Sequence, residues 1–243
     1  MIQLGGKGRP EGFNTWADAF LSQDNTGANT GKDPAKEPGN QLAGIDIRLQ
    51  PFDSPFALYG QVVGEDEDKF LPNCLMFQYG IEAWKSLKNS TLRVFAEYAD
   101  LTSYWWTNDP RTRNLSYGNH IYNDGYRYRG RPIGHWADQD SQMLSLGGLL
   151  QRKGGIGWGA TLRAGELNAG PLENAPPHQG GTGTSSVSNG VTTDYFSIDI
   201  FNARQYPQQG LSAYSSIGWE SLDVIGGSKD DGISAFLSLT RTF

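Results

Sequence analysis

Apolar and polar residues alternate strictly along several segments of this chain. In the clearest segment, every even position from 156 to 164 is apolar: Ile156, Trp158, Ala160, Leu162 and Ala164. The odd positions between them carry glycine, threonine or arginine. A period of two predicts a β-strand with one apolar face and one small or polar face.

Ten segments have this strand pattern, and none of them shows helical periodicity. The predicted strands are 16–23, 40–50, 56–64, 73–85, 90–101, 141–152, 155–166, 193–204, 210–221 and 233–243. The alternation is faint in the first segment, and Leu or Met occupies both faces of 141–152. We therefore expect one all-β domain over residues 1–243.

The connections between the predicted strands alternate between short and long. The short ones are 51–55, 86–90, 153–154 and 206–210, and the longer ones are 24–39, 64–72, 102–140, 167–192 and 223–232. A Greek-key sandwich would place long crossovers at both ends. Short turns on one side predict an antiparallel up-and-down transmembrane β-barrel, complete with ten strands or part of a larger barrel. The last residue, Phe243, then lies on the short-turn side, and a terminal aromatic residue is common in bacterial outer-membrane proteins.

The composition agrees with a barrel and excludes a helical membrane protein. Hydrophobic residues make up 37% of the chain and the mean hydropathy is −0.52, and no run approaches the roughly 20 apolar residues of a spanning helix. The predicted inward face carries eight charged residues: Asp46, Arg48, Glu82, Arg93, Glu97, Arg163, Asp199 and Glu220. A soluble sandwich with this face in water is the alternative. It does not explain Trp158 and Trp219 on the outward faces, which suit interfacial aromatic belts.

The net charge and the cysteine content exclude further classes of function. The net charge of −6 argues against nucleic acid, because proteins that bind it have basic faces. The single cysteine, Cys74, excludes an internal disulfide and a multi-cysteine metal site. We expect no cofactor, and a monomer in contact with outer-membrane lipid and lipopolysaccharide. Residues 1–7 lack the apolar core of a signal peptide, so we expect either that a signal was removed or that the exported protein starts upstream of Met1.

Aromatic and arginine residues concentrate in the predicted loop 102–140. The candidate polysaccharide-binding residues are Tyr104, Trp105, Trp106, His120, Tyr122, Tyr126, Arg127, Tyr128, Arg129, Arg131, Asp138 and Asp140. Aromatic faces stack on the C–H faces of sugars, and arginine pairs with carboxylates through two hydrogen bonds. Such residues suit an acidic polysaccharide. Alternatively the loop folds inward as a constriction held by arginine–aromatic stacking, and both interpretations can hold together.

Signals for catalysis or metal binding are few. His135 and Asp138 do not make a metal-ligand pattern, so we predict no metal site. A hydrolase that adds Ser141 to them is an alternative, but no Gly-x-Ser-x-Gly nucleophile elbow exists. Carboxylate pairs such as Glu65 and Glu67 could serve a glycosidase, although such pairs are more often solvated loop charges. We predict that the chain is not an enzyme.

Several stretches of the chain resemble the capsule-assembly Wzi family. The longest is HIYNDGYRYRGRPIGHWADQDS at 120–141, and the others are NQLAGID at 40–46, FAEYAD at 95–100 and the terminal Phe243. The resemblance spans roughly 40–243. Because members of the family carry more strands and an N-terminal helical plug, this chain is similar to the C-terminal part of one.

The family resemblance implies a function as well as a fold. It implies a lectin-like barrel of the bacterial outer membrane that binds exported capsular or extracellular polysaccharide and anchors it at the cell surface. The alternative is a substrate-selective, porin-like outer-membrane channel for acidic saccharides, in which the inward charges form a polar path.

Overall fold

The computed structural model describes residues 2–4, 12–20, 39–68, 71–103, 116–117, 126–129, 131–138, 140–169 and 192–241. Ten strands dominate it: β1 (Ile2–Leu4), β2 (Gly39–Leu49), β3 (Phe56–Asp68), β4 (Leu71–Leu87), β5 (Ser90–Asp100), β8 (Gln142–Arg152), β9 (Ile156–Leu167), β10 (Thr193–Tyr206), β11 (Leu211–Val224) and β12 (Lys229–Arg241). The smaller elements are helix α1 (Phe13–Phe20), strands β6 (Arg127–Tyr128) and β7 (Arg131–Pro132), and the 3₁₀ turn η2 (Pro207–Gln209). The predicted all-β class is confirmed.

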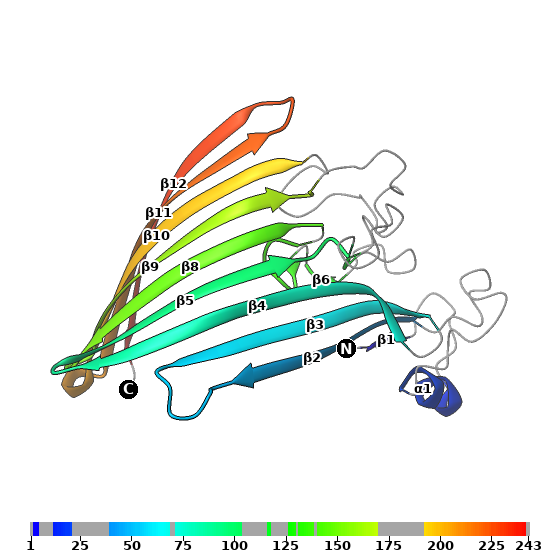
Figure 1. Cartoon of the computed structure of the whole chain (residues 1–243). Coiled ribbons are helices and arrows are strands. Elements are labelled where there is room, and N and C mark those ends of the chain that lie inside the picture. The colour runs from blue at the N-terminus through cyan, green and yellow to red at the C-terminus, as the bar shows by residue number, and fades with distance from the viewer. Residues whose placement is uncertain are drawn as a thin grey trace.

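The ten strands form one antiparallel sheet in which neighbours in the chain are neighbours in space. The small β6–β7 hairpin forms a separate sheet between β5 and β8 in the chain. Figure 1 shows the large sheet curving like the wall of an open barrel. Among the described residues, β1 and β12 are its two edges and do not pair with each other. The predicted up-and-down order is thus confirmed, and the sheet is open.

The exposure of side chains confirms the predicted two faces of the strands. Large apolar residues in mid-strand are open to the surroundings on one face, where Trp158 is 52% and Ile217 57% exposed. The opposite face carries the charged residues, and Arg163 donates to Asp199 across it over 2.9 Å. We call these the outward face and the luminal face. An apolar surface turned outward and a polar one turned inward suit a sheet surrounded by lipid.

Buried apolar side chains gather at the loop end of the sheet. One cluster contains Leu42, Met76, Leu101 and Tyr117, and a second contains Ala137, Met143, Leu167 and Tyr195. Each cluster joins luminal positions of the strands to residues of the connection that follows β5. The hydrophobic core therefore lies between the sheet and this returning connection.

Residues 13–20 form helix α1, so the predicted strand at 16–23 was wrong. Phe13, Trp16, Ala17 and Phe20 recur at the i, i+3, i+4, i+7 spacing of a helix. The helix has only about two turns, and three of these four residues are aromatic residues that also favour strands. For these two reasons the helical spacing was not recognised in the sequence. The tenth strand is instead β1, which pairs with the start of β2. No helix in the described parts of the chain is long and apolar enough to cross a membrane.

Short turns lie at one end of the sheet and long connections at the other (Figure 1). Arg241 pairs with Leu211 beside the β10–β11 turn, so β12 ends on the short-turn side, as predicted. At the opposite end, the predicted loops 64–72 and 223–232 are mostly strand. The runs 65–68 and 229–232 contain no apolar residue, which removes the alternation there, while the backbone hydrogen bonds of the ladder continue.

Candidate functional site

The connection between β5 and β8 returns over the luminal face at the loop end of the sheet. We call its described residues 101–103, 116–117, 126–129 and 131–138 the inner segment. Tyr126 stacks on Tyr117 with ring centroids 5.6 Å apart, and Trp136 packs against Tyr195 of β10 at 5.2 Å. The described part of the predicted loop thus folds inward and packs through its aromatic residues.

A buried ion pair fixes the shape of the inner segment. Arg127 donates from Nε to Oδ2 of Asp138 over 2.8 Å, and its Nη2 lies 2.7 Å from the same oxygen. The two side chains are only 9% and 0% exposed. Because a charge left buried without its partner is strongly unfavourable, this pair ties the β6–β7 hairpin to the residues that precede β8.

His135 and Trp136 connect the inner segment to the sheet. The Nδ1 atom of His135 accepts the backbone N–H of Ala137 over 3.2 Å, so it carries no proton. Burial, the main cause, lowers the pKa of His135 below its ordinary value; Arg163 adds to this effect and Glu97 opposes it. The guanidinium of Arg163 lies 5.5 Å from the centre of the Trp136 ring. The imidazole is therefore neutral near pH 7, and the indole is held against the luminal wall.

A cavity of about 770 Å³ lies between the luminal wall and the inner segment. Its sheet side includes Asp46, Gln61, Gln78, Phe95, Glu97 and Arg163, and its other side includes Tyr117, Tyr126, His135 and Trp136. The volume falls within the roughly 300–1,000 Å³ of small-ligand pockets. Aromatic faces, carboxylates and amides meet in it, a combination able to stack on a ligand and to bond its hydroxyl groups.

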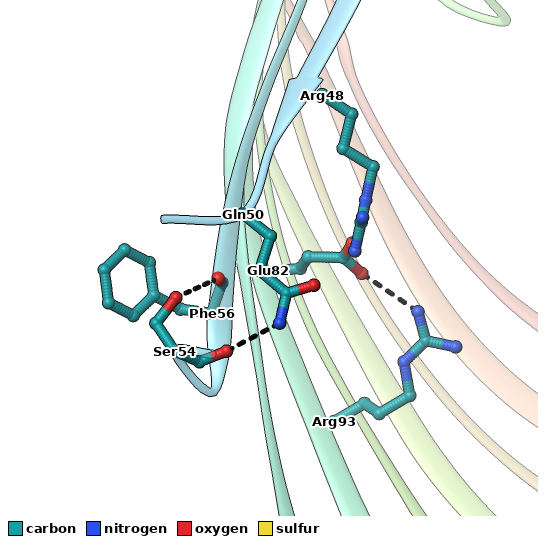
Figure 2. A network of polar contacts seen from close by, with 6 residues as sticks. All are labelled: Arg48, Gln50, Ser54, Phe56, Glu82 and Arg93. Atoms are coloured by element: carbon teal, nitrogen blue, oxygen red, sulfur yellow. Dashed lines mark hydrogen bonds and ion pairs between the residues drawn. The ribbon is translucent and has the colours of Figure 1, made fainter. Parts of the chain in front are cut away.

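A second hollow of about 580 Å³ continues along the luminal face of β2–β5 and shares five residues with the cavity. At the end of this hollow nearer the short turns, the carboxylate of Glu82 lies between two arginines (Figure 2). Glu82 accepts from Nε of Arg48 over 2.8 Å and from Nη2 of Arg93 over 2.9 Å. These links fix one carboxylate and two guanidinium groups across three strands of the wall.

Aromatic rings on the luminal wall lie over glycines of the neighbouring strand. A side chain added at Gly147 would collide with the ring of Phe95, and one added at Gly159 would collide with Phe201. Phe95 is nevertheless 37% exposed, so part of its side chain remains open to the lumen. These luminal aromatic residues were not predicted from the alternation. The available signal was an aromatic residue at an otherwise polar position of the alternation.

The predicted binding residues divide into three groups. Tyr104, Trp105, Trp106, His120 and Tyr122 lie outside the described residues. Tyr126, Arg127 and Asp138 are buried or partly buried in the packed inner segment, and Asp140 is buried just after it. Tyr128, Arg129 and Arg131 are exposed, and Arg129 lies 5.4 Å over the ring of Tyr128. The structure therefore brings together the pair Arg127 and Asp138 and, separately, an exposed tip on the β6–β7 hairpin.

The three residues of the hydrolase alternative have separate partners. Ser141 donates its hydroxyl hydrogen to the carbonyl of Ala137 over 2.7 Å, while Asp138 pairs with Arg127. His135 accepts from a backbone N–H through Nδ1. These contacts support structural roles. Within the described ranges, no group of three or more His, Cys, Asp or Glu side chains could hold a metal ion.

The sequence of this chain is similar to capsule-related proteins. The profile of the family described as capsule assembly protein Wzi matches residues 1–182. An uncharacterized 55.8 kDa protein of the cps region of Klebsiella pneumoniae is 41% identical over 103 residues, which cover 41% of this chain and 19% of that protein.

A solved structure has the same fold. It is Wzi of Escherichia coli, an outer-membrane protein involved in group 1 capsule assembly and described as a carbohydrate-binding β-barrel. The TM-score is 0.70 at 24% identity, and the match covers 99% of this chain and 47% of that one. The chain thus spans less than half the length of either protein.

Proposed function

Because the chain belongs to the capsule assembly protein Wzi family, we propose that it is a polysaccharide-binding wall of an outer-membrane β-barrel. It holds exported capsular or extracellular polysaccharide at the cell surface and binds it without chemical conversion. The cavity between the luminal wall and the inner segment carries this proposal, since it combines stacking surfaces with hydroxyl-bonding groups.

The opposite chemistry of the two sheet faces supports the membrane location. Ile45, Ile47 and Leu49 follow one another on the outward face of β2, and each is more than half exposed. In water such a surface would be an aggregation site, whereas in hydrocarbon it is the favourable one. Strands β2 and β5 have 11 residues each, and a tilted crossing needs roughly 9–11.

The exposed tip of the β6–β7 hairpin is the second contact we assign to the polysaccharide. Arg129 and Arg131 present guanidinium groups that suit the carboxylates of acidic sugars, and Tyr128, 65% exposed, offers a stacking face. Arg127 is already paired with Asp138, so its first role is to hold the hairpin in place. The aromatic residues at 104–106 and at 120–122 stay predicted contacts.

A binding experiment tests the proposed function. The purified chain in detergent micelles is titrated with polysaccharide extracted from the surface of the bacterium that makes it. We expect saturable binding, which weakens in the double variant Arg129→Ala/Arg131→Ala if the sugar is acidic. Absence of binding by the wild-type protein would refute the function.

A selective channel is a second candidate, supported by the polar track that the two adjoining hollows form along the luminal face. Measurement of single-channel conductance in planar bilayers separates it from an anchor. Discrete current steps that acidic oligosaccharides block would favour the channel. A silent bilayer together with polysaccharide binding would favour the anchor.

A further inference from the structure

The charges that face the luminal cavity set its preference among sugars. Asp46 and Glu97 place two carboxylates on its wall. The guanidinium of Arg163, which also lines it, already pairs with Asp199 at 2.9 Å. His135 is neutral, because it accepts a hydrogen bond through Nδ1. The described lining therefore presents two carboxylates and one guanidinium, and this guanidinium is already paired with Asp199.

The same wall offers hydrogen-bonding groups that are still available. Among the described residues, Asp46, Gln61 and Gln78 form no side-chain hydrogen bond, and Glu97 accepts one bond, from the hydroxyl of Tyr59 at 2.9 Å. A carboxylate has about four acceptor sites and an amide both donates and accepts. Adjacent hydroxyl groups of a sugar ring match such acceptors.

Phe95 supplies a stacking surface in the middle of this polar wall. Its ring rests on Gly147, is partly exposed and lines both hollows. An aromatic face of this kind is complementary to the apolar C–H face of a pyranose ring. Asp46, Glu97, Gln61 and Gln78 line the same two hollows as Phe95, so successive sugar rings along the hollows can meet the aromatic face and the acceptors.

We propose that the luminal cavity binds uncharged glycosyl units of the polysaccharide, with stacking on Phe95 and hydrogen bonds to Asp46 and Glu97. This proposal rests on the proposed polysaccharide-binding function and divides it between two places. The exposed arginines of the β6–β7 hairpin take the acidic groups, and the cavity takes neutral sugars. A uronate in the cavity would bring a third carboxylate beside Asp46 and Glu97, and the like charges would repel one another.

Two forms of the same polymer test the proposal. Polysaccharide from the surface of the producing bacterium is used as extracted, and after chemical reduction of its carboxyl groups to primary alcohols. Wild-type protein, the isosteric variant Asp46→Asn/Glu97→Gln, and a control, Glu220→Gln, are titrated with both. Glu220 is a luminal carboxylate outside the cavity lining, so the control removes a charge without touching the cavity.

The expected pattern differs between the two contact places. Asp46→Asn/Glu97→Gln should weaken binding of both polymer forms by about tenfold or more, the effect of losing charge-assisted hydrogen bonds. Glu220→Gln should bind like wild type, and Arg129→Ala/Arg131→Ala should affect only the unreduced polymer. Phe95→Leu, which still covers Gly147, should weaken both forms, while Phe95→Tyr should retain binding.

Two results would overturn the inference. One is unchanged binding of both forms by Asp46→Asn/Glu97→Gln and by Phe95→Leu. The other is tighter binding of the unreduced polymer by Asp46→Asn/Glu97→Gln, which would mean that the cavity holds an acidic unit. In either case wild-type binding would persist and the proposed function would stand. If wild-type protein bound neither polymer, the function itself would fail.

Discussion

Arg127 and Asp138, eleven residues apart in the chain, form an ion pair at 2.7 Å from which water is almost excluded. Arg127 comes from the β6–β7 hairpin, and Asp138 comes from the stretch that leads into β8. The pair therefore joins the exposed tip of the hairpin to the aromatic residues that line the cavity. Its integrity should matter for both places that we assign to the polysaccharide.

Removal of one partner of this pair should loosen the inner segment. In Arg127→Met, the Asp138 carboxylate stays buried without its cation, which costs about 3–5 kcal/mol. We expect faster cleavage of residues 101–140 in limited proteolysis, at unchanged β-content in circular dichroism. The double variant Arg127→Met/Asp138→Leu should recover much of the resistance, because it leaves no isolated charge. Equal sensitivity of the single and double variants would show that the pair is not the fastening element.

Gly147 should not accept a side chain, since the Phe95 ring occupies the space above it. We expect Gly147→Ala to displace the ring, to destabilise the protein by about 1–3 kcal/mol and to weaken polysaccharide binding. The neighbouring Gly148 faces outward, and a Cβ there would lie 3.7 Å from the nearest atom. Gly148→Ala is the matched control and should leave stability in urea titrations unchanged. Equal stability of both variants would contradict the packing of Phe95 on Gly147.

Adjacent residues of β11 should respond in opposite ways to an introduced charge. Ile217 faces outward and Ser216 faces the lumen. In lipid vesicles, Ile217→Arg should lose roughly 2–4 kcal/mol of the free energy of unfolding, the cost of arginine on a lipid-facing position near the bilayer midplane. Ser216→Arg should lose much less. The membrane location would be wrong if the two variants unfolded at the same urea concentration.

Acidification should weaken the inner segment through His135. Its pKa in the folded protein lies below the value of about 6.5 in the unfolded chain. The unfolded state therefore binds a proton first as the pH falls, so the stability of the segment is full above pH 6.5 and declines below it. Limited proteolysis of residues 101–140 at pH 7.5 and at pH 5 measures this decline.

The matching control for this pH effect is His135→Gln. Its side-chain oxygen can still accept the N–H of Ala137, but it does not titrate. This variant should lose most of the difference between the two pH values. If it kept the full difference, another group would be responsible.

The sheet could be predicted from the sequence because alternate residues of each strand face lipid and lumen, and their polarity differs accordingly. The segment 155–166 predicted β9 almost to the residue, and its neighbours followed by the same rule. The rule failed where consecutive residues are all polar, as in the acidic end of β3 at 65–68. It also failed for α1, whose two turns are too short to show a helical period clearly.

Less of the site could be read in this way. The aromatic residues of the loop were evident from their number. Arg127 and Arg129 look alike in the sequence, but Arg127 is buried and Arg129 is exposed. This difference depends on how the loop folds. Phe95 and Phe201 were overlooked because each is a large apolar residue on a mostly polar face. Both have a glycine opposite them on a neighbouring strand, a pairing that only the register shows.

The length of the β3–β4 hairpin has a consequence for where this protein meets other molecules. Strand β4 has 17 residues, so it runs for roughly 56 Å at about 3.3 Å per residue, whereas a tilted crossing uses only about 9–11 residues. In the membrane orientation that we propose, the surplus, together with the acidic run at 65–68, would extend beyond the hydrocarbon as a two-stranded projection. Large molecules that approach from that side would touch this projection before they reached the mouth of the barrel.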